Sequence, residues 1–144
     1  MSIEEIFPKL GGSHYRRTSE PDEKYNCIAW AAGRDDEWWD IAPGYRWPDN
    51  VPRHGAVENL VKLYESLGFV CCASNAREEG FEKVAVYGDG YMWTHAARQL
   101  DNGKWTSKLG QLEDIEHESL EALSGAVYGS VVQVLKKPTT WQSK

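Results

Sequence analysis

The tripeptide Asp101-Asn102-Gly103 constrains the fold more than any other part of this sequence, because it separates two apolar-rich runs at residues 92–100 and 104–109. A turn of this composition between two such runs is the strongest short-range signal for a β-hairpin. Further strands are predicted at residues 69–72, 83–87 and 130–135. The second half of the chain is therefore predicted to form a mainly antiparallel sheet.

Helices are predicted mainly before these strands. Apolar side chains recur every three or four positions across residues 57–67, and Gly68 follows, which is typical of an amphipathic helix and its end. A shorter helix is expected from Asn26, a favourable N-cap, to Gly33, and another over residues 119–123. Helices followed by antiparallel strands indicate an α+β domain.

The 144 residues correspond to the size of one compact domain. We expect an N-terminal arm at residues 1–24, a single domain at residues 25–138 and a polar tail at residues 139–144. Residues 35–54 contain three tryptophans and three prolines. This composition favours a long ordered loop that is packed by its aromatic side chains.

The net charge is −6, and the lysines and arginines are scattered along the chain. A nucleic-acid partner is not expected, because proteins that bind nucleic acids gather basic side chains on one face. No segment approaches the roughly 18 consecutive apolar residues of a membrane-spanning helix, and acids stand where a signal peptide needs positive charge. We therefore expect a cytoplasmic protein without a membrane partner, and leave open export that needs no signal peptide.

The cysteines and histidines do not form a recognisable metal or disulfide pattern. Cys71 and Cys72 are adjacent and so poorly placed to bond each other, which argues against a disulfide framework. No CxxC pair occurs, and the four histidines are widely dispersed. We expect neither a metal nor another cofactor.

Cys27 follows Asn26 at the start of the short predicted helix. Unpaired backbone N–H groups and the helix dipole stabilise an anion at such a position, which favours a reactive thiolate. Alternatively, Cys27 is a small buried apolar residue, since cysteine is among the residue types most often found in cores. A nucleophilic cysteine needs a base, and the best candidate is His95, which precedes the small residues Ala96 and Ala97. The alternative for His95 is a strand histidine that is hydrogen-bonded to a neighbour.

The chain resembles a known family over residues 20–138. The blocks that carry this resemblance are YNCIAWAAG, WWDIAPGYRWP, GFEKVAVY, THAARQL, GKWTSKLG, EDIEH and YGSVVQVLKKP. They look like those of a widespread bacterial domain family without an established reaction. The order of elements is also distantly similar to the papain-like NlpC-type and CHAP-type cysteine hydrolases. That resemblance implies a papain-like fold in which Cys27 is the nucleophile and His95 the general base and acid.

A third member of such a site would orient the histidine ring. If three residues form the hairpin turn, Ser107 shares a sheet face with His95, whereas a two-residue turn would bring Lys108 there. Asp114 offers better chemistry, because a carboxylate can hold the histidine tautomer, although an N-cap or a solvated acid is an equal alternative. Asp114 and Ser107 therefore compete for this place, and a Cys-His dyad alone is a further alternative.

The sequence also offers candidates for binding a substrate. The backbone N–H of Cys27 would contribute to an oxyanion hole, with Asn26 as a second donor if its side chain does not cap the helix. Aromatic residues of the loop would wall a substrate groove or, alternatively, cover the core, and these are Trp38, Trp39, Tyr45 and Trp47.

The leading hypothesis is a cysteine-dependent hydrolase or acyl transferase that acts on a peptide or another amide through Cys27 and His95. The rival hypothesis is a non-catalytic protein-interaction module of papain-like architecture, with the aromatic loop as its contact surface and an inert Cys27. A third hypothesis is a toxin-antitoxin or immunity partner that docks through its acidic surface.

Overall fold

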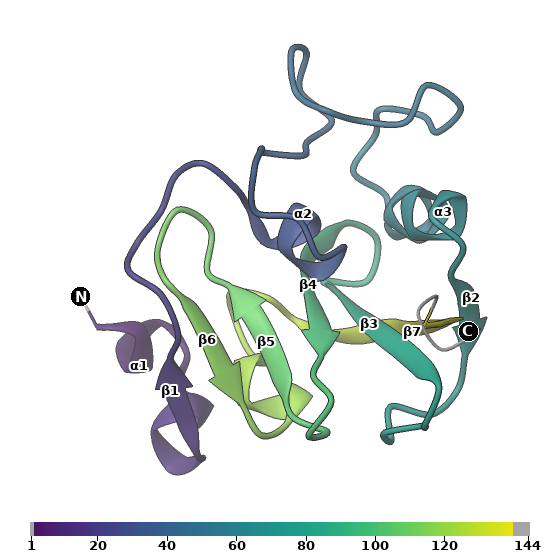
Figure 1. Cartoon of the computed structure of the whole chain (residues 1–144). Helices are drawn as coiled ribbons and strands as arrows, with labels where there is room; N and C mark the ends of the chain where they lie inside the picture. The colour runs from purple at the N-terminus through teal and green to yellow at the C-terminus, as the bar shows by residue number, and fades with distance from the viewer. Residues whose placement is uncertain (1, 140–144) are drawn as a thin grey trace.

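A computed structural model describes residues 2–139 and has one antiparallel sheet of seven strands at its centre (Figure 1). The strand order across the sheet is β1-β6-β5-β4-β3-β7-β2. The strands are β1 Tyr15–Arg17, β2 Val70–Cys72, β3 Phe81–Gly88, β4 Trp93–Gln99, β5 Trp105–Lys108, β6 Asp114–His117 and β7 Ser130–Pro138. The predicted α+β class and the mainly antiparallel sheet are therefore confirmed.

Short helices cover both faces of the sheet. The face that we call the helix face packs against α2 (Cys27–Ala31) and α3 (Val57–Ser66). The opposite face, here called the arm face, packs against α1 (Ile3–Ile6) and the 3-10 helices η1 (Pro8–Gly12) and η2 (Leu120–Leu123). Within residues 2–139, no helix is both long and apolar enough to cross a membrane.

Side chains of β3 alternate between the two cores, as the two-residue period of a strand requires. Val84 and Val86 belong to the core on the helix face, whereas Ala85 and Tyr87 belong to the core on the arm face. The partner strand β4 follows the same rule, with Ala96 in the first core and Ala97 in the second. The face of each neighbouring residue therefore follows from its strand register.

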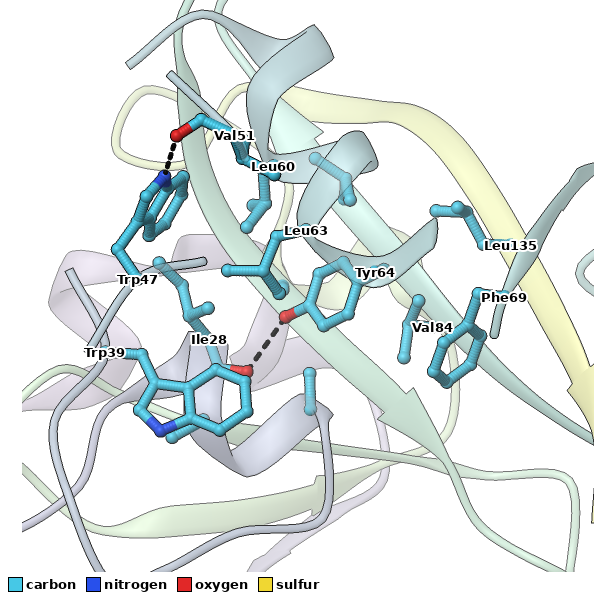
Figure 2. Packing of buried hydrophobic residues seen from close by; sticks show 14 residues of the cluster. Ile28, Trp39, Trp47, Val51, Leu60, Leu63, Tyr64, Phe69, Val84 and Leu135 are labelled. Atoms are coloured by element: carbon cyan, nitrogen blue, oxygen red, sulfur yellow. Dashed lines mark hydrogen bonds between the residues drawn. The ribbon is translucent and has the colours of Figure 1, made fainter. Parts of the chain in front are cut away.

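The two predicted helices on the helix face are confirmed, together with their end signals. The side chain of Asn26 caps α2, and Gly33 has a φ of 85°, which only glycine adopts readily. The buried side of α3 packs on the sheet, and the hydroxyl of Tyr64 donates to the backbone oxygen of Ile28 at 2.9 Å (Figure 2). This bond joins α3 to α2.

The hairpin between β4 and β5 has the three-residue turn. The backbone N–H of Leu100 donates to the oxygen of Lys104 at 2.7 Å, so Asp101, Asn102 and Gly103 form the turn. Gln99 pairs with Trp105 in the ladder. This register decides which later residues of β5 share a face with His95.

Two parts of the fold differ from the sequence-based prediction. Residues 1–24 do not form a separate arm, because β1 pairs with β6 and the side chains of Phe7 and Leu10 are buried on the arm face. The strand β6 was not among the strands predicted from the sequence, and all four of its residues are buried. Of the predicted polar tail, residues 140–144 lie outside the described residues.

Candidate functional site

Asn26 uses both the oxygen and the nitrogen of its side-chain amide in structural hydrogen bonds. Its Oδ1 accepts from the backbone N–H groups of Ala29 at 3.3 Å and Trp39 at 3.2 Å, and its Nδ2 donates to the oxygen of Trp39 at 2.7 Å. The residue caps α2 and fastens the aromatic loop to it. This corrects the prediction that Asn26 contacts a substrate or an oxyanion, since the cap was the condition that excluded that role.

Cys27 is the first residue of α2 and is half-buried against the helix-face core. Burial raises the pKa of its thiol to about 11, although backbone N–H groups of Ala96, Ile28 and Cys27 itself act in the opposite direction. Removal from water therefore outweighs the helix-start amides. At neutral pH the thiol is protonated and not a thiolate.

His95 lies on the other side of the sheet. It pairs directly with Tyr87 in the β3–β4 ladder, and directly opposed side chains lie on the same face, so the imidazole is on the arm face. Cys27 packs on the helix face, against the core that contains Ala96. The structure does not bring Cys27 and His95 together, and the predicted dyad is not assembled.

The surroundings of His95 are aromatic and closed. Its ring stacks on Tyr128 with a centroid distance of 4.1 Å and lies 5.3 Å from the ring of Tyr87. The side chain is fully buried, and neither ring nitrogen has a hydrogen-bond partner among residues 2–139. Burial, with a smaller contribution from His117, holds the pKa of His95 well below its usual value, so the ring is neutral.

Ser107 shares the arm face with His95, as the three-residue turn predicts, but it bonds to a different histidine. The hydroxyl of Ser107 lies 2.8 Å from Nε2 of His117, and Nδ1 of His117 lies 2.9 Å from the oxygen of Ser119. A carbonyl oxygen only accepts, so Nδ1 carries the proton and Nε2 accepts from Ser107. Ser107 therefore orients His117, not His95.

His117 itself is also removed from solvent. The side chain is fully buried on the arm face, and burial lowers its pKa to about 4. Only Ile115 is apolar among the four residues of β6, so the segment lacks the apolar-polar alternation by which a strand is recognised in a sequence.

Asp114 lies on the helix face of the sheet, where β6 meets the segment that precedes α2. Its carboxylate accepts from the hydroxyl of Tyr25 at 2.6 Å and from the hydroxyl of Thr18. Its strand partner Lys108 donates to the backbone oxygens of Asp22 and Gly110, both at 2.6 Å. Asp114 therefore fastens the chain before α2 to the sheet and does not reach His95.

The aromatic loop covers the core. Trp39 and Trp47 are buried, and Trp38 is half-buried. Nε1 of Trp47 donates to the backbone oxygens of Val51 and Pro52 (Figure 2 shows the bond to Val51), and its ring stacks on Trp93 at 5.4 Å. These contacts favour the interpretation in which the loop covers the core over the one in which it walls a substrate groove.

The most exposed aromatic side chain of residues 2–139 lies elsewhere, at the turn between β3 and β4. Tyr91 is 61% exposed and lines a hollow together with exposed Val132, at 39%, and exposed Met92, at 38%, follows Tyr91 in the chain. With Val57 and Val61 of α3, these residues form what we call the Tyr91 surface, next to this hollow of about 470 Å³. This surface could not be predicted from the sequence, because solvent exposure at a turn depends on which segments pack nearby.

The backbone holds Tyr91 rigidly while its ring projects. The oxygen of Tyr91 accepts from the N–H of Val57 at 2.8 Å, and its N–H donates to the carboxylate of Asp89. The ring of His54 lies edge-on at 5.9 Å. A projecting aromatic side chain on a fixed backbone is suited to binding, because little freedom is lost when a partner docks.

Comparison with known protein families gives a match over most of the chain. The family model of DUF7689, a domain of unknown function, matches residues 16–136. The chain belongs to this family. The predicted membership of a family without an established reaction is thereby confirmed, and the match begins within β1, in the segment predicted as an arm. Searches of curated proteins and of solved structures found no match.

Metal ligands are not grouped in the part of the chain that the structure describes. Among residues 2–139, no cluster of three or more His, Cys, Asp or Glu side chains has the arrangement to hold an ion. All three thiols are free, with Cys71 exposed on β2.

Thiol labelling against pH tests the environment of Cys27. In the folded protein, exposed Cys71 is expected to react first, and Cys27 slowly at pH 7. The Cys27 rate should rise with pH toward its pKa of about 11, because only the thiolate reacts. Site-resolved mass spectrometry after iodoacetamide treatment provides the measurement.

The control variant is His95→Phe, which keeps an aromatic ring against Tyr128 and removes the imidazole. It should leave the Cys27 rate unchanged, since the two side chains lie on opposite faces. Selective modification of Cys27 below pH 8 in the wild type, weakened by His95→Phe, would instead mean that a dyad forms in solution.

Proposed function

We propose that this DUF7689 domain is a non-catalytic protein-interaction module whose contact surface is the Tyr91 surface. The observation that carries the proposal is the exposed Tyr91, which is anchored through its backbone and lines one hollow together with exposed Val132. Apolar side chains that gather on an exposed surface are typical of a docking site. The contact surface therefore differs from the aromatic loop of the sequence-based hypothesis.

The separation of the predicted catalytic residues supports a non-catalytic role. A nucleophile and its base must come within hydrogen-bond reach, but Cys27 of α2 packs on the helix face of the sheet and His95 lies on the arm face. Asn26, Asp114 and Ser107 each hold structural hydrogen bonds. Replacing Cys27 with serine is accordingly expected to leave partner binding unchanged.

A photo-cross-linking amino acid at position 91 tests the proposal in the cell that makes the protein. The expected result is one discrete adduct from position 91 that disappears when Val132→Asp is added and persists with Cys27→Ser. The matched control places the same amino acid at Tyr45, which is also exposed, at 46%, but lies on the aromatic loop. Equal adducts from both positions, or none from position 91, would refute the proposal.

A second candidate is the papain-like cysteine hydrolase acting on a peptide or another amide. Two observations favour this candidate. Cys27 begins a helix that packs on an antiparallel sheet, and its thiol lies close to the backbone N–H of Ala96, the residue after His95. Catalysis would require His95 to leave its stack with Tyr128. Both the papain-like architecture and this activity stay predictions, and the labelling experiment decides between the two candidates.

A further inference from the structure

Acidic side chains surround the Tyr91 surface. Glu58 and Glu65 are exposed on α3 and border the hollow, with Lys62 between them. Asp89 lies at the turn, where its carboxylate accepts from the backbone N–H groups of Tyr91 and Met92. These bonds lower the pKa of Asp89, first through Met92 and then through Tyr91, so this carboxyl is ionised at neutral pH. These four residues, Glu58, Lys62, Glu65 and Asp89, form what we call the rim, which therefore carries more negative than positive charge.

The glutamates of this rim are available to a partner. Among the ion pairs of residues 2–139, none joins Lys62 to Glu58 or to Glu65. The chain as a whole has a net charge of −6, so other parts of the protein do not offset the local excess. An apolar centre with free carboxylates around it is complementary to an apolar side chain flanked by cations.

The charge of the rim also distinguishes between the possible binding partners of an exposed apolar surface. A second copy of the chain would bring the same acidic rim against Glu58, Glu65 and Asp89, and like charges oppose such docking. An anionic membrane surface would be repelled for the same reason. A segment of another protein with arginine or lysine beside its apolar residues meets neither objection.

We propose that the Tyr91 surface binds a basic, apolar segment of a partner protein, with an aliphatic or aromatic side chain against Tyr91 and Val132 and with cations at Glu58 and Glu65. This inference rests on the proposed function and adds the chemistry of the partner. The apolar contact supplies affinity, and the rim charges supply selectivity and a faster encounter.

The probe is a fluorescein-labelled peptide in which a Leu-Leu pair is flanked by lysines, with a matched peptide that has glutamines in place of the lysines. Fluorescence anisotropy with the purified chain measures both affinities. The basic peptide is expected to bind about tenfold more tightly at low salt, and the difference should shrink as salt screens the rim. Tyr91→Ser should weaken the binding of both peptides.

Variants that remove acidic charges test whether the preference for the basic peptide arises at Glu58 and Glu65. Glu58→Gln/Glu65→Gln is expected to weaken the basic peptide about fivefold and to leave the neutral peptide unchanged. The control Glu118→Gln/Glu121→Gln removes the same charge from exposed acids near η2, away from α3, and should leave both affinities unchanged. Equal losses in the two double variants would show an effect of net charge alone and overturn the inference.

The remaining outcomes separate this inference from the proposed function. Equal affinity for the two peptides, or no binding of the basic one, overturns the basic partner, while a specific adduct from position 91 still supports the interaction module. Self-association lost with Tyr91→Ser, seen by sedimentation, identifies a second copy as the occupant and overturns the inference. Binding to vesicles that contain phosphatidylserine overturns it as well.

Discussion

Replacing Trp47 with alanine is expected to lower the free energy of unfolding by about 3–5 kcal/mol, the range for deleting a buried aromatic side chain. Trp47 is 5% exposed, stacks on Trp93, and donates from Nε1 to the backbone oxygens of Val51 and Pro52. The alanine variant loses the apolar contacts and leaves both oxygens without this donor. Urea denaturation followed by circular dichroism measures the change.

The matched control is Tyr45→Ala in the same loop. Tyr45 is exposed, and surface substitutions usually change stability by less than about 0.5 kcal/mol. A loop that walls a substrate groove would give small effects for both variants, because its aromatic rings would face water in the free protein. A loss below about 1 kcal/mol for Trp47→Ala would therefore contradict the loop's role in covering the core.

Asp114→Leu is expected to destabilise the fold by about 3–5 kcal/mol, since breaking a buried interaction with a charged group leaves its partners uncompensated. The hydroxyls of Tyr25 and Thr18 would lose their acceptor, and buried Lys108 would lose the carboxylate opposite it in the ladder. Thermal and urea unfolding of the variant measure this loss.

Two further variants test whether the loss of stability in Asp114→Leu comes from the hydrogen bonds that Asp114 accepts. Asp114→Asn keeps the shape and one acceptor oxygen, so it should cost about half as much as Asp114→Leu. In a double-mutant cycle, Tyr25→Phe should cost less in the Asp114→Leu background than in the wild type, because the shared bond is already lost. An Asp114 that orients a catalytic histidine would show the reverse pattern, with stability preserved and Cys27 reactivity altered.

The sequence predicted those features whose physical cause lies within a few residues. Asn26 caps α2 because its own side chain reaches the next turn, and Gly33 ends that segment because it adopts a positive φ. The three-residue turn that closes at Gly103 likewise depends on adjacent positions, and it placed Ser107 correctly on the face of His95.

Features set by distant partners could not be predicted in this way. The strand β6 lies between β5 and β1, and its pairing with β1, from nearly a hundred positions earlier, is revealed by no local pattern. For Asp114 the sequence indicated a carboxylate that accepts hydrogen bonds, but its donors, Tyr25 and Thr18, come from the segment before α2. The type of chemistry was evident, and the identity of the partner was not.

The predicted pair of Cys27 and His95 likewise depends on contacts between distant parts of the chain. The order of a helix cysteine followed by a strand histidine is present, yet the face on which His95 lies depends on the register of β4 with β3. A shift of one residue would move His95 to the helix face and Ala96 to the arm face. Sequence order alone therefore cannot assemble this pair.

Both outer strands of the sheet come from earlier parts of the chain than the strands they pair with. The ladder of β1 needs β6, and the ladder of β2 needs β7, the last strand. During synthesis, which runs from the N-terminus, Phe7 and Leu10 leave the ribosome long before the sheet that buries them exists. The nascent chain must hold apolar side chains in water until its final third emerges, so it offers chaperones a binding site throughout that interval.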